Sequence, residues 1–189
     1  MDELTRLAID AGRGDQVALA AFVRRTQPEV WRLCARLGDR DAADDLTQEV
    51  YLRALPALTR FRGDSSARTW LLQVARHTCA DHVRRRTRRR ALVERLVARG
   101  SDLVEPDGSG EVDLDAAVAA LDEDRRAAFV LTQVVGLSYA EAAEVCGVPI
   151  GTIRSRVARA RGDLLTALGA DAAAHPVDAE GRASDGATG

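Results

Sequence analysis

The chain has 189 residues and a formal net charge of −2, and 46% of its residues are hydrophobic, enough for one domain or two small ones. Aromatic residues make up only 4%, which disfavours a β-sandwich or barrel and favours helices rich in Ala, Leu and Arg. No apolar run approaches the roughly 18–20 residues of a membrane span, and the acidic first residues do not resemble a signal peptide. We therefore expect an all-α protein of the cytoplasm with no membrane insertion.

The near-neutral total charge conceals strong segregation. All 27 residues of the Lys and Arg class are arginines; residues 84–99 hold eight of them and one glutamate, whereas residues 100–124 hold nine acidic residues and no arginine. The acidic stretch also contains Ser, Gly and Pro, which is typical of a linker. We therefore expect two small helical domains, 1–90 and 114–168, joined by a flexible acidic linker, 91–113, and followed by a disordered tail, 169–189.

The three cysteines carry no metal or disulfide signature. Cys34, Cys79 and Cys146 are odd in number, far apart in the sequence and without a C-x-x-C motif, which excludes a zinc site by spacing. Each lies among apolar residues of a helical pattern, so we expect buried thiols. No metal and no cofactor is expected.

The first domain opens with helical patterns at 3–11 and 15–37, and Pro28 predicts a break or kink inside the second. A helix over 41–55 would be two-faced. Its apolar side holds Ala43, Leu46, Val50, Ala54 and Ala57. Its opposite side holds Asp41, Asp44, Asp45, Gln48, Leu52 and Leu55, with Glu49 at the margin. Such a face is either a docking surface or an ordinary solvated surface with two stray leucines, and periodicity leaves both open.

The residues from Phe61 to Ser66 predict a loop, and Ser66 or Ser65 is a suitable cap for a helix over about 67–90. The buried stripe of that helix would hold Trp70, Leu71, Val74, Ala75, Thr78 and Cys79. The other side would hold Thr69, Gln73, Arg76, His77, Ala80 and Arg84, and leads into the arginine run at 84–90. A polar face that ends in clustered arginines suits a helix laid on nucleic acid.

The second domain begins with helices at 114–121 and 122–135, the latter capped by Asp122. Ser138 and Glu141 then form a capping box, Gly147 closes the short helix, and Pro149 opens a helix that runs to about residue 168. The apolar stripe of that last helix is Ile150, Ile153, Val157, Ala160 and Leu164. A short capped helix, a glycine turn and an arginine-rich second helix indicate a helix-turn-helix over about 139–158, which favours DNA reading over a plain α-hairpin.

Several of these segments, in this order, resemble the bacterial sigma-70 family of RNA polymerase sigma factors. They are Asp45-Leu46-Thr47-Gln48-Glu49-Val50, Phe61-Arg62-Gly63-Asp64-Ser65, Thr69-Trp70-Leu71, Leu137 to Ala143, and Gly151 to Arg156. The two-domain plan is similar to the extracytoplasmic-function (ECF) class, which keeps only sigma regions 2 and 4. The resemblance implies a transcription initiation factor, and not an enzyme, that binds core RNA polymerase and directs it to specific promoters.

The resemblance also implies roles for individual residues. The helix at 41–55 would dock on the clamp helices of the polymerase β′ subunit through Asp44, Asp45, Gln48, Glu49, Leu52 and Leu55. Region 2 would melt and read the −10 promoter element with Phe61, Arg62, Ser65, Ser66, Gln73, Arg76, His77 and Arg84. Region 4 would read the −35 element with Thr152, Arg154, Ser155, Arg156 and Arg159. The β flap of the polymerase, promoter DNA and an anti-sigma factor are the further partners implied.

Two other functions remain open from the residues. One is a helix-turn-helix transcriptional regulator that binds duplex DNA without polymerase. The other is a metal-dependent nuclease that uses Asp41, Asp44, Asp45 and Glu49, although no histidine lies in that helix and its face includes leucines.

Overall fold

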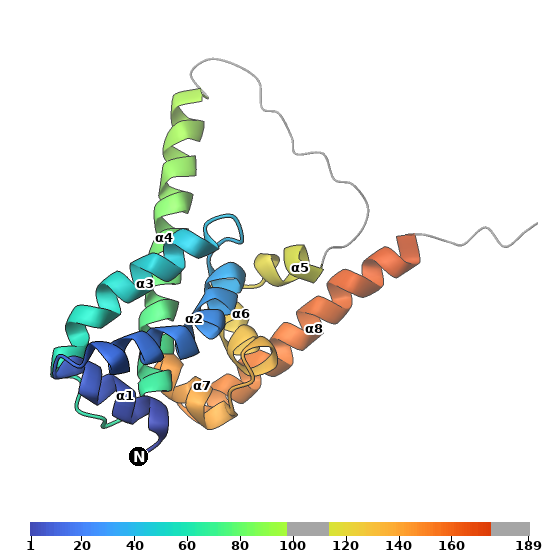
Figure 1. Cartoon of the computed structure of the whole chain (residues 1–189). Coiled ribbons are helices and arrows are strands. Elements are labelled where there is room, and N and C mark those ends of the chain that lie inside the picture. Colours follow the sequence, from blue (N-terminus) through green and yellow to red (C-terminus); the bar gives the residue numbers. More distant parts are fainter. Residues whose placement is uncertain (98–113, 175–189) are drawn as a thin grey trace, which may run out of the picture.

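The computed structural model describes residues 1–97 and 114–174, and every regular element in these two ranges is helical (Figure 1). The first range contains α1 (Glu3–Gly12), α2 (Gln16–Leu37), α3 (Ala43–Ala57), the 3₁₀ turn η1 (Leu58–Arg60) and α4 (Ala67–Val97). The second contains α5 (Leu114–Ala120), α6 (Glu123–Phe129), the π-helical turn η2 (Val130–Val134), α7 (Tyr139–Cys146) and α8 (Ile150–Ala174). The expected all-α fold is confirmed.

In the first half, α2, α3 and α4 pack against one another and α1 covers α2 and η1. Phe22, Leu33, Val50 and Leu71 are almost fully buried where these helices meet. The apolar side of α3 is as expected except at its end, where Ala57 is exposed and Leu58 is buried instead. The chain enters η1 after Ala57, and the tighter turn rotates Leu58 into the core.

Pro28 does not break its helix. The segment from Gln16 to Leu37 is one continuous helix, so of the expected break or kink the break is wrong. The start of α2 is fixed by Asp15, whose carboxylate accepts hydrogen bonds from the backbone N–H groups of Val17 (2.8 Å) and Ala18 (3.0 Å). A proline removes one backbone donor, and the burial of Val30 and Leu33 just beyond it outweighs that loss.

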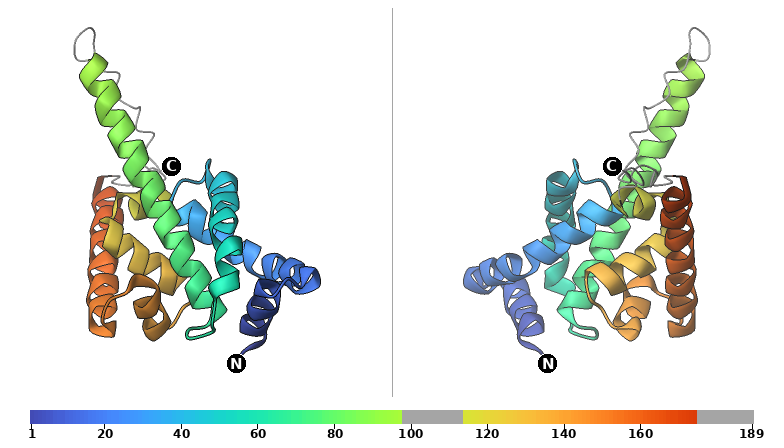
Figure 2. Two further views of the ribbon diagram at one scale, coloured as in Figure 1. Left: turned by 90° about the vertical axis from the view of Figure 1, so that its left-hand side faces the viewer. Right: turned by 90° about the vertical axis from the view of Figure 1, so that its right-hand side faces the viewer.

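In the second half, α5, α6 and α7 pack on α8 and η2 contacts α6 and α7, and Leu131, Val145, Ile153 and Val157 are buried in the core. Side views place α8 and α1 on opposite sides of the molecule (Figure 2). The apolar stripe of α8 is buried as expected from Ile153 onward, whereas Ile150 is 41% exposed because it begins the helix beyond the edge of α7.

The two halves pack against each other, with α7 beside the first turns of α4 and η2 and α5 beside α2. Two residues expected on the open side of α4 are therefore buried, Thr69 at 5% exposure and Ala80 at 8%. The expectation that α4 buries only one stripe of side chains is wrong at these two positions, because other helices cover α4 on more than one side.

Both long helices extend past their expected ends. α4 continues to Val97 and projects from the body of the molecule, and α8 continues to Ala174, so residues 169–174 are helical and not part of a disordered tail (Figure 1). The rest of the expected linker and tail, residues 98–113 and 175–189, lies outside the described residues.

Cys34 and Cys79 are buried, whereas Cys146 is half-buried. Burial raises the pKa of the Cys146 thiol, which keeps it protonated. Among the described residues, no group of three or more His, Cys, Asp or Glu side chains is placed to hold a metal ion. Within the same residues, no helix is long and apolar enough to cross a membrane.

Candidate functional site

The helix α3 presents an acidic face to solvent. Asp44, Asp45 and Gln48 are exposed, and Leu52 exposes 74% of its surface. The two aspartates lie in the first turn, where the helix dipole favours negative charge. The periodicity of this helix thus separates a buried and an exposed side as expected, and the exposed side holds a large apolar side chain.

The remaining two expected residues of α3 are less accessible. Glu49 is half-buried and forms ion pairs with Arg53 and with Arg85 of α4, the latter at 3.3 Å. Leu55 is half-buried and packs against the core. Trp31 of α2 joins the exposed face of α3: it is 36% exposed and its Nε1 donates to Asp44 Oδ1 at 2.8 Å.

The expected loop at 61–66 lies between η1 and α4, and Gly63 adopts a φ of 79° there. Phe61 and Trp70 stack at the base of the loop, with ring centroids 5.1 Å apart and a tilt of 40°. An open groove of about 530 Å³ lies beside these rings. It is lined by Ala57, Arg60, Phe61, Arg62, Asp64, Ser65 and Trp70. Of these lining residues, Ala57, Arg60, Asp64 and Trp70 are not among the residues expected at the −10 element.

Ser66 caps α4, because its Oγ accepts a hydrogen bond from the backbone N–H of Thr69 at 3.0 Å. A second groove, of about 770 Å³, lies on this side of the loop and brings Ser65, Ser66 and Gln73 together with Glu141 and Glu144 of α7. The expected −10 residues Phe61, Arg62 and Ser65 thus share one groove, and Ser65, Ser66 and Gln73 share another.

Arg76 and His77 contact each other directly, with Arg76 Nη2 3.0 Å from His77 Nε2. Since the guanidinium can only donate, the imidazole accepts there and carries its proton on Nδ1. Burial and the charge of Arg76 lower the pKa of His77, so the ring is neutral at pH 7. Arg76 also lines a small cavity with Glu123 and Arg126 of α6.

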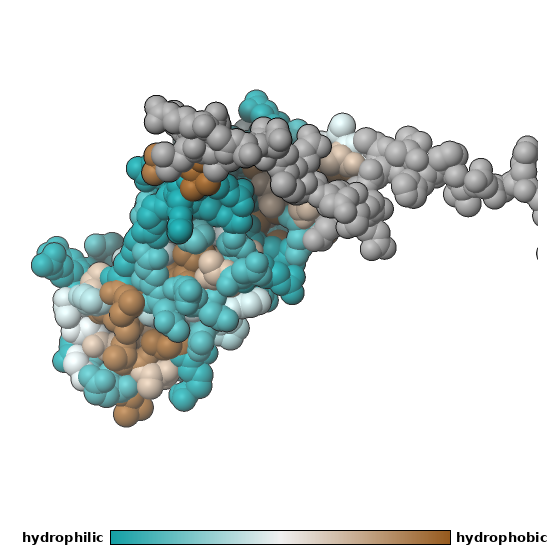
Figure 3. All heavy atoms as spheres, turned by 90° about the horizontal axis from the view of Figure 1, so that it is seen from above, coloured by the Kyte–Doolittle hydropathy of each residue, from teal (hydrophilic) through white to brown (hydrophobic). Residues whose placement is uncertain are grey.

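The arginine run occupies the part of α4 that projects from the body. Arg84 lies about 16 Å along the helix from Gln73 at 1.5 Å per residue, so it does not share the grooves near the loop. Its guanidinium contacts Asp81 at 2.9 Å, and Arg86 pairs with Asp39. Side chains 84–90 are all exposed. The face seen in Figure 3 is largely hydrophilic, with a hydrophobic patch at the lower left of the view and smaller hydrophobic groups above it.

The helix-turn-helix has the local geometry that the sequence predicts. Ser138 Oγ accepts from the Glu141 backbone N–H at 3.2 Å, and Glu141 Oε2 accepts from the Ser138 backbone N–H at 2.8 Å. The hydrogen bonds that the Glu141 carboxylate accepts from the Ser138 backbone N–H and from its hydroxyl lower the pKa of that carboxyl. Gly147 closes α7 with a φ of 66°, a conformation that favours glycine.

The outer face of α8 carries the residues expected at the −35 element. Arg154, Ser155 and Arg159 are exposed and Thr152 is half-buried. Arg156 differs from them, because its side chain is only 20% exposed and pairs with Asp124 of α6. Thr152, Ser155, Arg156 and Arg159 lie on the side of α8 opposite its buried stripe, and Arg154 lies on the flank.

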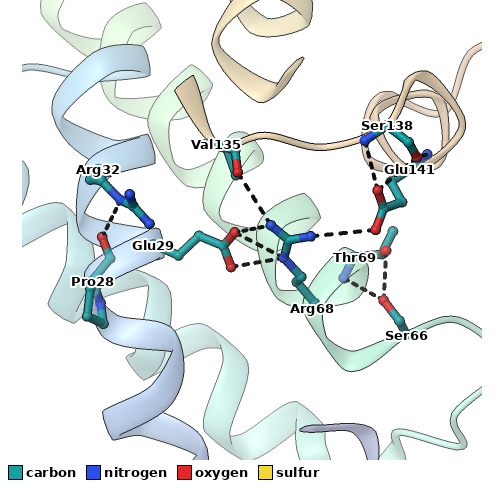
Figure 4. Close-up of polar contacts among 9 residues, drawn as sticks. All are labelled: Pro28, Glu29, Arg32, Ser66, Arg68, Thr69, Val135, Ser138 and Glu141. Carbon is teal, nitrogen blue, oxygen red and sulfur yellow. Dashed lines mark hydrogen bonds and ion pairs between the residues drawn. The ribbon is translucent and has the colours of Figure 1, made fainter. Parts of the chain in front are cut away.

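Arg68, at the start of α4, joins the two halves (Figure 4). Its Nε donates to Glu29 Oε1 of α2 at 3.0 Å, and Nη2 donates to the Val135 carbonyl at 3.4 Å. Nη1 lies 3.5 Å from Glu141 Oε1 of α7. Glu29 is only 16% exposed, and its charge raises the pKa of Arg68. Sequence reasoning missed Arg68 because its partners lie far away along the chain.

Two family models match the chain, sigma-70 region 2 over residues 22–89 and sigma-70 region 4 over residues 111–164. The chain is 51% identical over 175 residues to the ECF RNA polymerase sigma factor SigC of Mycobacterium tuberculosis, which covers 87% of this chain and 90% of that protein. It is 33% identical over 163 residues to the ECF RNA polymerase sigma-E factor of Escherichia coli K12, with 79% of this chain and 85% of that protein covered.

Two solved structures resemble the whole arrangement. One is CnrH in complex with the cytosolic domain of CnrY, with a TM-score of 0.70, 28% identity, and coverage of 90% of this chain and 99% of that chain. The other is the sigma factor RpoE of Bartonella quintana in complex with the anti-sigma factor NepR, with a TM-score of 0.61, 29% identity, and coverage of 81% and 98%.

Proposed function

The chain belongs to the sigma-70 family, in its extracytoplasmic-function class, and we propose that it divides the work of promoter selection among three surfaces. It is a transcription initiation factor that associates with RNA polymerase and selects promoters. In this proposal α3 binds the polymerase, the first half opens and reads the −10 element, and α8 reads the −35 element.

The polymerase surface is the exposed face of α3, which would meet the β′ clamp helices. Its residues are Asp44, Asp45, Gln48, Glu49, Leu52 and Leu55, and we add Trp31. The observation that carries this assignment is the 74% exposure of Leu52, because a leucine in the middle of an otherwise polar helical face gains free energy only when a partner covers it.

The −10 surface is the loop at 61–66 with the start of α4. Opening a base pair and exposing a base costs a few kcal/mol, which contacts to the single strand must offset. The tilted Phe61 and Trp70 rings beside Arg60 and Arg62 offer stacking and phosphate contacts in one groove. Ser65, Ser66, Gln73, Arg76 and His77 would complete this surface, and Arg84 would hold phosphate farther along α4.

The −35 surface is the outer face of α8. An exposed arginine on a recognition helix can donate two hydrogen bonds to guanine in the major groove. Arg154 and Arg159 are already exposed, and Arg156 would exchange Asp124 for DNA.

DNA binding at −10 requires the two halves to separate in this proposal. Gln73 shares its groove with Glu141 and Glu144, whose charges repel phosphates, and Arg76 faces α6. In one similar solved structure the sigma factor RpoE is bound by the anti-sigma factor NepR, and in the other CnrH is bound by the cytosolic domain of CnrY, so we include an anti-sigma factor among the partners. Because it would act on RNA polymerase, the protein would work in the cytoplasm.

The family membership disfavours a regulator that works without polymerase, and the absence of a metal-holding cluster among the described residues leaves the nuclease without support. A band shift with promoter DNA, with and without core polymerase, separates the sigma function from that of an independent regulator. The sigma function gives a specific band only when core enzyme is present. A tight specific band without it supports the independent regulator.

The docking surface is tested by Leu52→Asp, with Leu165→Asp as the matched control because Leu165 is 72% exposed on α8. We expect Leu52→Asp to weaken core polymerase binding at least about tenfold, since a charge would be buried at the interface, and to leave the fold intact. Leu165→Asp should bind like wild type. Equal core affinity of Leu52→Asp and wild type, measured by fluorescence anisotropy, would contradict the assignment.

A further inference from the structure

The helix α1 lies outside residues 22–89, which the region 2 family model matches, yet it contacts both ends of the expected −10 loop. At one end, Gly12 approaches the backbone so closely that a Cβ on it would lie 2.3 Å from the Leu58 carbonyl oxygen. At the other end, Thr5 contacts the first residue of α4, Ala67. The segment that carries the loop is therefore held by α1 on both sides.

The contact between Thr5 and Ala67 is a buried hydrogen bond. Ala67 N–H donates to Thr5 Oγ1 at 3.0 Å, and the two residues are separated by 62 positions in the sequence. Thr5 is 3% exposed and Ala67 is fully buried. A backbone N–H in the first turn of a helix has no partner within the helix, so Thr5 supplies the acceptor that α4 lacks there.

Asp2 fixes the Thr5 hydroxyl. Thr5 Oγ1 donates to Asp2 Oδ2 at 2.6 Å, and the Thr5 backbone N–H donates to Asp2 Oδ1 at 2.8 Å. These bonds lower the pKa of the Asp2 carboxyl, which stays ionised near neutral pH. With its proton committed to Asp2, the hydroxyl must present a lone pair to Ala67.

The same threonine also packs under the loop. Gly63 has a φ of 79°, and a Cβ built on it would lie 3.5 Å from Thr5 Cγ2 and 3.4 Å from Ile9 Cδ1. Thr5 lines the groove that contains Ser65, Ser66 and Gln73. The methyl group of Thr5 therefore restricts the position of the loop at Gly63, and its hydroxyl restricts the position of the first residue of α4.

We propose that Thr5 is a positioning residue for −10 recognition. By capping Ala67, it fixes the origin of α4 and with it the orientation of Ser65 and Ser66, the last residues of the loop that selects the base. This proposal rests on the function proposed above, in which the loop at 61–66 reads the −10 element. Loss of the hydroxyl would leave the Ala67 N–H buried without a partner, and the helix start would shift to recover one.

The test uses the full chain with core polymerase and three variants, Thr5→Val, Thr5→Ser and Asp2→Ala. Valine keeps the shape of threonine and lacks the hydroxyl, whereas serine keeps the hydroxyl and lacks the methyl. Single-round run-off transcription is measured on a promoter that the wild-type holoenzyme uses and on its single-base −10 variants. Core affinity is measured separately by anisotropy.

We expect Thr5→Val to reduce the preference for the best −10 base over the worst by about tenfold, the scale set by losing a partner for one buried donor. Thr5→Ser should restore the preference, and core affinity should be unchanged in both. A uniform loss on all promoters, or an unchanged preference in Thr5→Val, overturns the proposal.

If Thr5→Val does not fold, Asp2→Ala decides, because Asp2 is exposed and its removal frees the Thr5 hydroxyl to turn; it also removes the N-cap bond to the Thr5 backbone N–H, which lies at the start of α1 and away from Ala67. Reduced −10 preference in Asp2→Ala supports positioning, and a wild-type preference overturns it. A wild-type holoenzyme that ignores −10 sequence altogether would instead overturn the proposed −10 function of the loop, which distinguishes the two failures.

Discussion

Arg156 is the least exposed of the arginines expected to read the −35 element, because Asp124 pairs with it. We expect Arg156→Ala to weaken binding of the holoenzyme to the −35 element by about 1–3 kcal/mol, with the loss concentrated at one base pair. Anisotropy titrations against −35 duplexes with single base changes measure it, at fixed salt because phosphate contacts depend on ionic strength.

The partner of Arg156 provides the control. Asp124→Asn removes the competing charge and keeps the side-chain shape, so it should release Arg156 and tighten −35 binding. A weaker complex with Asp124→Asn would mean that the ion pair orients Arg156 for DNA and does not hold it away.

His77 predicts a dependence of stability on pH. Burial and Arg76 lower its folded pKa below the usual 6.5, so on acidification the unfolded chain takes up the proton first. The free energy of unfolding should therefore fall as pH drops from about 7.5 through the unfolded pKa, near 6.5, to about 5.5. Urea denaturation should show a smaller fall for His77→Gln. Identical pH profiles would contradict the lowered pKa.

At the scale of elements, the capping box of α7 should stabilise the helix-turn-helix. Ser138→Ala removes the acceptor for the Glu141 N–H and should cost about 1 kcal/mol in the free energy of unfolding. Ser155 offers a matched control, since its hydroxyl bonds the Thr152 carbonyl on an exposed helix face, and Ser155→Ala should change stability by less than about 0.5 kcal/mol. Equal losses in thermal unfolding would contradict the role of the cap.

Residues that lie close together in the sequence were enough to predict the structural features that depend on contacts within one helix or turn. The capping box, the αL glycine at 147 and the apolar stripe of α3 all follow from residues within one or two turns of each other. Predictions from such neighbouring residues failed where an element distant in the sequence packs on the helix. Thr69 and Ala80 are buried because a second helix layer covers α4, and no periodicity of α4 itself contains that information.

The residues of the candidate sites also divide into those that helical spacing predicts and those that depend on distant partners. The exposed face of α3 and the arginines of α8 were predictable from helical spacing, and family resemblance supplied their roles. Trp31, Arg68 and the Thr5 contact to Ala67 were not, because each depends on a partner 13 to 67 residues away along the chain. Tertiary contacts of this separation leave no period in the sequence.

At the scale of the whole molecule, Arg68 should hold the two halves together. Arg68→Ala removes the bonds to Val135 and Glu141 and leaves the largely buried Glu29 without its cation. We expect the variant to be more extended, with a larger radius of gyration in solution scattering. Arg25→Ala is the control, because its pair with Glu3 at 2.8 Å is exposed and lies within the first half. An unchanged radius in Arg68→Ala would contradict the role of this contact.

The central claim is that this chain supplies promoter choice and strand opening while core polymerase supplies the chemistry. Single-round run-off transcription from a library of native upstream fragments tests it most directly, with core polymerase alone, with wild-type chain and with Leu52→Asp. We expect transcripts from a specific subset of fragments with the wild-type chain, and background levels with core alone or with Leu52→Asp. If the wild-type chain adds no initiation above core polymerase on any fragment, the chain does not act as a sigma factor.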